Sequence, residues 1–129
     1  EARGMGVTLN TLGALEAEEK HYARARQLYG ESFGIRAHIG DRRGALIAAL
    51  NILQLTCMDA DWERAARLLG FVDGVQAQLG IQLFKQARDF QEQAATDIRA
   101  ALDEKTFGRE HLLGRALTLE SAARWLDSL

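Results

Sequence analysis

Hydrophobic residues recur along most of the chain at spacings of three and four, which is the period of an amphipathic helix. Short polar segments and single glycines interrupt this pattern. The pattern predicts seven helices, at residues 5–19, 22–39, 42–58, 62–79, 81–102, 103–113 and 118–129. The predicted fold class is therefore all-α.

Residues suited to helix ends mark several of these boundaries. Side-chain oxygens at an N-cap accept the free backbone N–H groups of a first turn, and four residues are predicted N-caps: Asp41, Asp61, Asp103 and Thr118. Gly40 and Gly80 follow predicted helices, where glycine adopts the left-handed conformation of a helix end at little cost. The chain has twelve glycines and no proline, so glycine is its main punctuation.

The same pattern predicts which side chains are buried. In the first helix the predicted apolar side consists of Val7, Leu9, Leu12 and Leu15, and Gly13 allows a second helix to approach closely. Inward positions later in the chain include Ala25, Ala65, Phe84, Phe107 and Leu112. Four polar residues of the second helix lie off its apolar stripe and are expected in solvent: Arg24, Gln27, Glu31 and Arg36.

One nine-residue stretch occurs twice. Tyr22–Gly30 returns 40 positions later as Trp62–Gly70, and six of the nine positions keep their character. Each copy follows a Leu-Asn-x-Leu segment (Leu9–Leu12 and Leu50–Leu53), with one residue fewer in the turn of the second copy. A fixed period of 20–50 residues is typical of solenoids. The predicted organisation is one domain, 1–129, with repeats at 1–40 and 41–80 and capping helices at 81–129.

These stretches resemble tetratricopeptide repeats. The matching residues are Leu9, Leu12 and Gly13 in the first helix and Tyr22, Ala25 and Tyr29 in the second. The 40-residue period, the junction at Gly40–Gly44 and the tail at Arg115–Glu120 are similar to the C-terminal repeats of large bacterial signal-transduction ATPases. These include transcriptional regulators of the maltose-activator and antibiotic-regulator kinds. The resemblance implies a right-handed α-solenoid of two such hairpins plus a three-helix cap, in a parent with a nucleotide-binding module and an output domain.

Composition narrows the class of protein. Hydrophobic residues make up 47% and charged residues 26%, as in a folded domain. The net charge is −2 and charges of both signs are interspersed, so the sequence has no basic stripe and does not predict direct nucleic-acid binding. No apolar run is long enough to span a membrane. The single Cys57 indicates a reducing cytoplasm, and a start at Glu1 without Met suggests a fragment of a larger protein.

The candidate binding surface is a shallow groove along the first helices of the two hairpins. Its predicted lining is Val7, Asn10, Ala14, Ala17, Ala48, Asn51, Leu55 and Met58. Asn10 and Asn51 fall at equivalent repeat positions, and an amide offers both a donor and an acceptor to a peptide backbone. The alternative is that each Asn bonds a neighbouring helix and that Met58 is part of the core.

No residue is predicted to be catalytic or to bind a metal or cofactor. His21, His38 and His111 lack companions at zinc-site spacing and are expected at the surface. Cys57 has no His nearby in sequence and is expected to act as a small buried hydrophobe. The glycines occur singly rather than in a phosphate-binding loop.

The sequence thus predicts a non-enzymatic, cytoplasmic module that contacts a protein, a peptide or other domains of its parent chain. The outer face of the first hairpin is predicted to be bare, so the chain self-associates or upstream repeats cover that face. The alternative function is a small-molecule sensor that holds its effector on the concave face.

Overall fold

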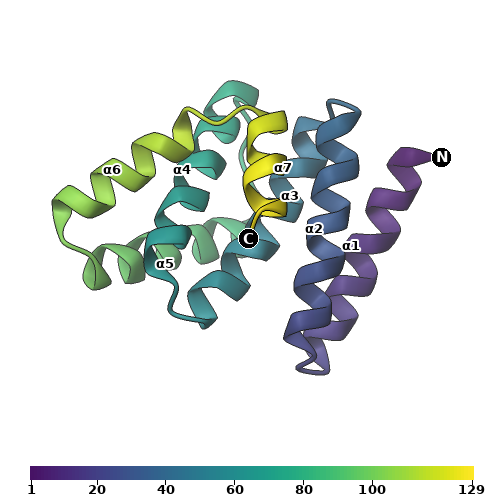
Figure 1. The fold of residues 1–129 in the computed structure, drawn as a ribbon, viewed down its shortest axis with the longest axis horizontal. Helices are drawn as coiled ribbons and strands as arrows, with labels where there is room; N and C mark the ends of the chain where they lie inside the picture. Colours follow the sequence, from purple (N-terminus) through teal and green to yellow (C-terminus); the bar gives the residue numbers. More distant parts are fainter. The chain divides into compact units, whose positions relative to one another are not determined.

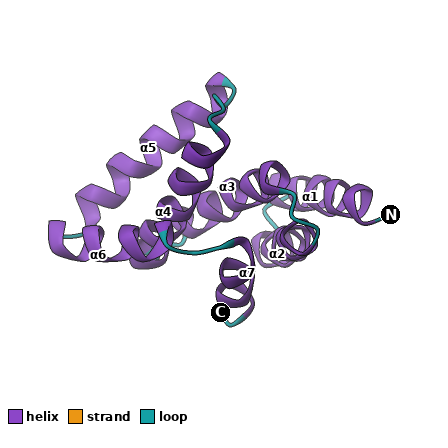
Figure 2. Cartoon of the chain, turned by 90° about the horizontal axis from the view of Figure 1, so that it is seen from above, coloured by secondary structure: helices purple, strands orange, loops and turns teal.

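The computed structural model describes all 129 residues and contains seven helices and no strand (Figures 1 and 2). The helices are α1 (Ala2–Glu18), α2 (Tyr22–His38), α3 (Arg42–Met58), α4 (Trp62–Leu79), α5 (Lys85–Ala101), α6 (Glu104–Arg115) and α7 (Leu119–Asp127). The all-α prediction is confirmed, and α3 and α4 have the predicted bounds. The largest difference lies before α5, where residues 81–84 are not helical.

The chain divides into two compact units. The first unit consists of residues 1–52 and 118–129, and the second of residues 53–117. The three helices after residue 80 have different partners, because α5 and α6 pack with α4 whereas α7 packs with α2. The helix pairs α1–α2 and α4–α6 make the most extensive contacts within their units.

The centre of the first unit is the antiparallel pair α1–α2 (Figure 1). Gly13 of α1 admits the ring of Tyr29, which lies 2.7 Å from the place where a Cβ on Gly13 would be. This confirms the close approach predicted at Gly13. Gly6 lies seven residues before Gly13, and its carbonyl accepts a 2.7 Å hydrogen bond from the buried hydroxyl of Ser32. Burial, and to a lesser degree the Glu18 carboxylate, raise the pKa of Tyr29.

The apolar side predicted for α1 is not the side that packs. Gly6 and Gly13 are the only buried residues of this helix, whereas Val7, Leu12 and Leu15 are exposed. The prediction was wrong because the two glycines leave room for the side chains of Arg36 and Tyr29, which directs the glycine side toward α2. Leu12 and Leu15 lie on another side of α1, which faces away from α2.

Arg36 of the first unit also departs from expectation. It was expected in solvent, but it is only 5% exposed. Its Nη1 donates to the carbonyl of Gly44 at 2.7 Å, and its Nε is buried without a hydrogen-bond partner. Glycines make room for this side chain, because a Cβ on Gly6 or Gly44 would come within 3.0 Å of it.

The second unit is held by a close crossing of α4 and α6. A Cβ on Gly70 would overlap the backbone carbonyl of His111, and one on Gly114 would overlap that of Arg67. The two helices therefore touch backbone to backbone. Ala65 is fully buried in α4, as predicted.

Two large apolar residues expected to face inward are exposed. Phe84 is 91% exposed in the segment before α5, because that helix starts only at Lys85. Leu112 is 68% exposed although Phe107 of the same helix is buried. The buried side of α6 instead follows Phe107, Glu110 and Gly114, at helical spacings of three and four.

Most of the predicted helix caps are present. Asp41 accepts from the backbone N–H of Gly44 at 3.0 Å, and Asp103 accepts from that of Thr106 at 2.8 Å. Thr118 forms a reciprocal capping box with Ser121. Asp61 makes no capping bond, and that prediction was wrong, because its carboxylate lies 3.2 Å from Nη1 of Arg64 instead. Gly40 and Gly80 both have positive φ, at 72° and 61°.

Caps and turns repeat with a period of 40 residues throughout the first two helix pairs. Glu1 caps the N–H of Gly4 as Asp41 caps that of Gly44. The turns that follow α1 and α3 match as well, with positive φ at Lys20 (64°) and Ala60 (56°). The Leu-Asn-x-Leu segments suggested that the turn of the second copy is one residue shorter than that of the first. The matching positions of positive φ show that the two turns have the same length. With this period the equivalent of Asn51 is Thr11, not Asn10.

Candidate functional site

The residues of the predicted groove have different environments. Val7, Ala14 and Met58 are exposed, Asn10, Ala17 and Asn51 are partly buried, and Ala48 and Leu55 are fully or almost fully buried. A buried side chain does not line a surface groove, so Ala48 and Leu55 act in packing.

The structure brings Asn10 and Asn51 together. Asn51 Nδ2 donates to Asn10 Oδ1 at 3.2 Å, in a partly buried contact between α1 and α3. The bond agrees with the alternative given for these two residues in the sequence analysis, in which each Asn bonds a neighbouring helix. It satisfies part of their hydrogen-bonding capacity inside the first unit.

An exposed and largely apolar stripe runs along α1 and is here called the open face. It consists of Met5, Thr8, Leu12 and Leu15, all of them exposed. Met5, Leu12 and Leu15 are 55%, 44% and 53% exposed. Spacings of three and four place the stripe on one side of the helix, away from the glycines that meet α2. The sequence pattern identified these leucines as apolar but assigned them to the core.

The equivalent stripe of α3 is buried. Forty residues after the open face lie Ala45, Ala48, Ile52 and Leu55, each 5% exposed or less. Within the first unit, Gly44 and Asn51 of α3 contact Arg36 of α2 and Asn10 of α1. Ala48 lies between these two contacts on the same side of α3, so α1 and α2 meet α3 on this side.

A shallow, open depression lies at the N-terminal end of the open face. Its lining is Glu1, Gly4, Met5, Thr8 and Leu9. Gly4 has no neighbour near the position of a Cβ except the side chain of Glu1. The depression is therefore the part of α1 that corresponds to the place where Arg36 meets Gly44 on α3.

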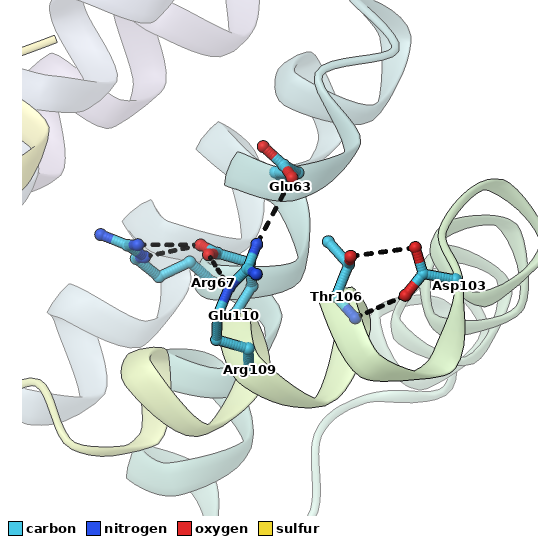
Figure 3. Close-up of polar contacts among 6 residues, drawn as sticks. All are labelled: Glu63, Arg67, Asp103, Thr106, Arg109 and Glu110. Atoms are coloured by element: carbon cyan, nitrogen blue, oxygen red, sulfur yellow. Dashed lines mark hydrogen bonds and ion pairs between the residues drawn. The ribbon is translucent and has the colours of Figure 1, made fainter.

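In the second unit, an ionic cluster joins α4 to α6 (Figure 3). Arg67 holds the buried Glu110 through Nε at 3.0 Å and Nη2 at 2.9 Å. Arg109 reaches the other oxygen of Glu110 at 3.3 Å and approaches Glu63 at 3.6 Å. Glu110 lies about one helical turn before Gly114, so the cluster joins α4 and α6 near their point of closest approach.

A second polar group joins α4, α5 and α6. Asp73 accepts a 2.7 Å bond from Gln91 Nε2, and its other oxygen lies 2.7 Å from Nε2 of His111. The His111 ring stacks on Phe107, and the guanidinium of Arg99 lies 4.2 Å from the centre of the Phe107 ring. His111 is thus a partly buried packing residue rather than the surface histidine that was expected.

Two further titratable groups, Cys57 and Asp103, have pKa values shifted by burial, by a nearby charge or by a helix cap. Burial, and then the carboxylate of Asp97, raise the pKa of the Cys57 thiol to about 11, so it is protonated at neutral pH. The backbone N–H of Thr106, and then its hydroxyl, lower the pKa of the Asp103 carboxyl (Figure 3). No group of three or more His, Cys, Asp or Glu side chains has an arrangement suited to a metal. None of the helices has the length and apolar character needed to cross a bilayer.

Comparisons with known proteins give no relative for this chain. No protein-family model matches it, and neither a curated protein nor a solved structure matches it.

Proposed function

We propose that this chain is a non-enzymatic protein-interaction module, built as a right-handed solenoid of tetratricopeptide-like hairpins with C-terminal capping helices. The 40-residue recurrence of caps and turns supports the repeat architecture. The resemblance of Tyr22–Gly30 and Trp62–Gly70 to such repeats supports a role as the sensor or scaffold arm of a cytoplasmic bacterial multidomain regulator.

The observation that carries this proposal is the open face of α1. Met5, Leu12 and Leu15 each leave about half of their surface in water. Full burial of such a side chain contributes roughly 1.5–3 kcal/mol, so covering the remaining half of each contributes about 1 kcal/mol. Three of them along one helix offer a partner a continuous apolar contact that the fold itself does not use.

The shape of this surface favours a protein partner over a small-molecule effector. Small-molecule sites are concave and bury most of their ligand, whereas the depression beside Gly4 is shallow and open. A helix laid along the open face would cover the stripe from Met5 to Leu15.

The test is a matched pair of substitutions, Leu12→Lys on α1 and Ile52→Lys at the equivalent position of α3. We expect the wild-type chain to self-associate as its concentration rises in light scattering, because the open face is uncovered. Leu12→Lys should reduce this association and leave the thermal midpoint unchanged. Ile52→Lys should unfold the chain, because Ile52 is buried.

Two outcomes would contradict the proposal. A wild-type chain that stays strictly monomeric at high concentration would show that the face is not adhesive. A Leu12→Lys variant that melts as low as Ile52→Lys would show that Leu12 belongs to the core.

A further inference from the structure

The first helix pair shows how a helix of this kind is covered. Arg36 of α2 lies across the first turn of α3 and donates to the carbonyl of Gly44 at 2.7 Å. Its Cδ lies 2.8 Å from the place of a Cβ on Gly44, so only glycine leaves room for it there. Asp41, three residues earlier, caps the N–H of Gly44. An acidic cap followed by glycine thus forms a seat for an arginine.

The same seat exists at the start of α1, without an arginine. Glu1 caps the N–H of Gly4, exactly 40 residues before the Asp41–Gly44 pair. Gly4 is exposed, and nothing but the Glu1 side chain lies near the position of its Cβ. The depression lined by Glu1, Gly4 and Met5 occupies the place that Arg36 fills on α3.

The residues that follow the glycine can be compared between α3 and α1 in the same way. Ala45, Ala48 and Ile52 of α3 are buried, and Gly44 and Asn51, which precede and follow Ala48 on the same side of that helix, contact Arg36 and Asn10 of the first helix pair. Met5, Thr8 and Leu12 hold the equivalent positions of α1 and are exposed. A seat and an apolar stripe on one side of a helix therefore form one docking surface, used on α3 and unused on α1.

We propose that the open face of α1 receives a helical hairpin of the same kind as α1–α2, whose second helix inserts an arginine beside Glu1 and Gly4. The proposal rests on the proposed interaction function and names its partner. The Glu1 carboxylate favours a cationic side chain at this point, because opposite charges attract across a short distance. The apolar stripe supplies the rest of the contact.

The experiment uses an extended chain, in which residues 1–40 are placed a second time ahead of Glu1. This spacing sets the added hairpin against α1 as the native hairpin is set against α3. We expect hydrogen exchange of the original α1 amides to slow about tenfold or more, which corresponds to ~1.4 kcal/mol of added protection. The added copy presents an open face of its own, so it carries Leu12→Lys, and the extended chain should then remain monomeric.

Two variants make the test specific to the seat. Arg36→Met in the added copy alone should reverse most of the slowing. Gly4→Leu in the original copy should do the same, because it fills the depression. In the chain without the extension, Gly4→Leu should not speed the exchange of α1, since leucine is a better helix former than glycine and its Cβ would meet only the flexible Glu1 side chain.

Unchanged exchange in the extended chain would overturn the proposal, and so would slowing that survives both variants. A dimer of the extended chain in which two molecules cover each other's original α1, in place of the added hairpin, would overturn it as well. If the Leu12→Lys test succeeds while the extended chain fails, the open face binds a partner of another kind. If both fail, the interaction function fails with it.

Discussion

Alanine in place of Gly114 tests whether α4 and α6 touch backbone to backbone. The Cβ of the new side chain would overlap the carbonyl oxygen of Arg67 and lie 2.8 Å from its carbonyl carbon. It would also lie 2.9 Å from the backbone N of Phe71. These atoms belong to a helix backbone and cannot move aside as a flexible side chain does, so the two helices must separate.

The magnitude follows from two opposed effects. Replacing glycine by alanine inside a helix stabilises it by roughly 0.5–1 kcal/mol. Overpacking a close contact costs roughly 1–3 kcal/mol and occasionally more. Separation also lengthens the nearby Arg67–Glu110 contact, which joins the same two helices. We expect Gly114→Ala to lower the free energy of unfolding by about 1–3 kcal/mol in total.

The assay is a thermal and denaturant unfolding series followed by circular dichroism, with Gly108→Ala as the matched control. Gly108 lies in the same helix, is exposed and has nothing within 4 Å of its Cβ position. This control should raise the midpoint slightly. A second pair compares Gly70→Ala with Gly30→Ala, the equivalent position of α2, where a Cβ meets nothing within 4 Å.

The reasoning would be refuted if Gly114→Ala and Gly108→Ala shifted the midpoint upward by similar amounts. In that case helix propensity alone would account for both, and the crossing of α4 and α6 would have to be wider than the structure indicates. A loss at Gly114 without a loss at Gly70 would also count against a reciprocal contact.

Three further predictions concern Ala65, the ionic cluster around Glu110, and Cys57. Ala65→Leu should lower the free energy of unfolding by roughly 1–3 kcal/mol, because Ala65 is fully buried, and an unchanged melting midpoint would count against that position. Glu110→Ala should cost about 1–3 kcal/mol because it removes the buried carboxylate that Arg67 holds through two contacts. Glu63→Ala, at the exposed end of the same cluster, should cost less than about 1 kcal/mol, and equal losses in denaturant melts would contradict this difference. Cys57 should react slowly with a thiol reagent at neutral pH and faster as the pH rises toward its pKa of about 11; a neutral-pH rate equal to that of free cysteine would refute the raised pKa of this partly buried thiol.

Helical periodicity predicted the elements well because each helix needs only its own residues to show the pattern. The bounds of α3 and α4 were predicted to the residue, and Gly40 and Gly80 were found in the expected left-handed conformation. The start of α5 was predicted too early, since four residues after Gly80 are not helical. Their apolar character resembles a helix face but does not specify backbone conformation.

Periodicity does not state which side of a helix meets its neighbour, and this is why the open face was missed. In α1 the leucines and the pair Gly6 and Gly13 each define a stripe. Hydrophobicity favours the leucine stripe, whereas the room needed by the large side chains of Arg36 and Tyr29 favours the glycine stripe, and the second decides the packing. The spacing of seven between the glycines was present in the sequence and would have identified it.

Contacts between residues far apart in the chain could not be predicted from local patterns. Arg67 and Glu110 are 43 residues apart, and Asp73 and His111 are 38 apart. Glu110 shares a helix side with Phe107 and Gly114, which indicates burial, but its partner depends on how α6 meets α4. The same limit applied to Arg36, whose seat is formed by glycines of two other helices.

The register of the repeat is set by caps and turns more reliably than by apolar residues. The Leu-Asn-x-Leu segments suggested a shift of 41, because leucine and asparagine happen to recur at that distance. An apolar residue can move by one position and still lie near the buried side of a helix. A capping acid cannot, because its oxygen must reach one particular N–H group, and neither can the residue with positive φ in the turn. Glu1 and Asp41, and Lys20 and Ala60, therefore fix the period at 40. The equivalence of Gly4 with Gly44, and with it the seat for an arginine on α1, depends on that one-residue difference.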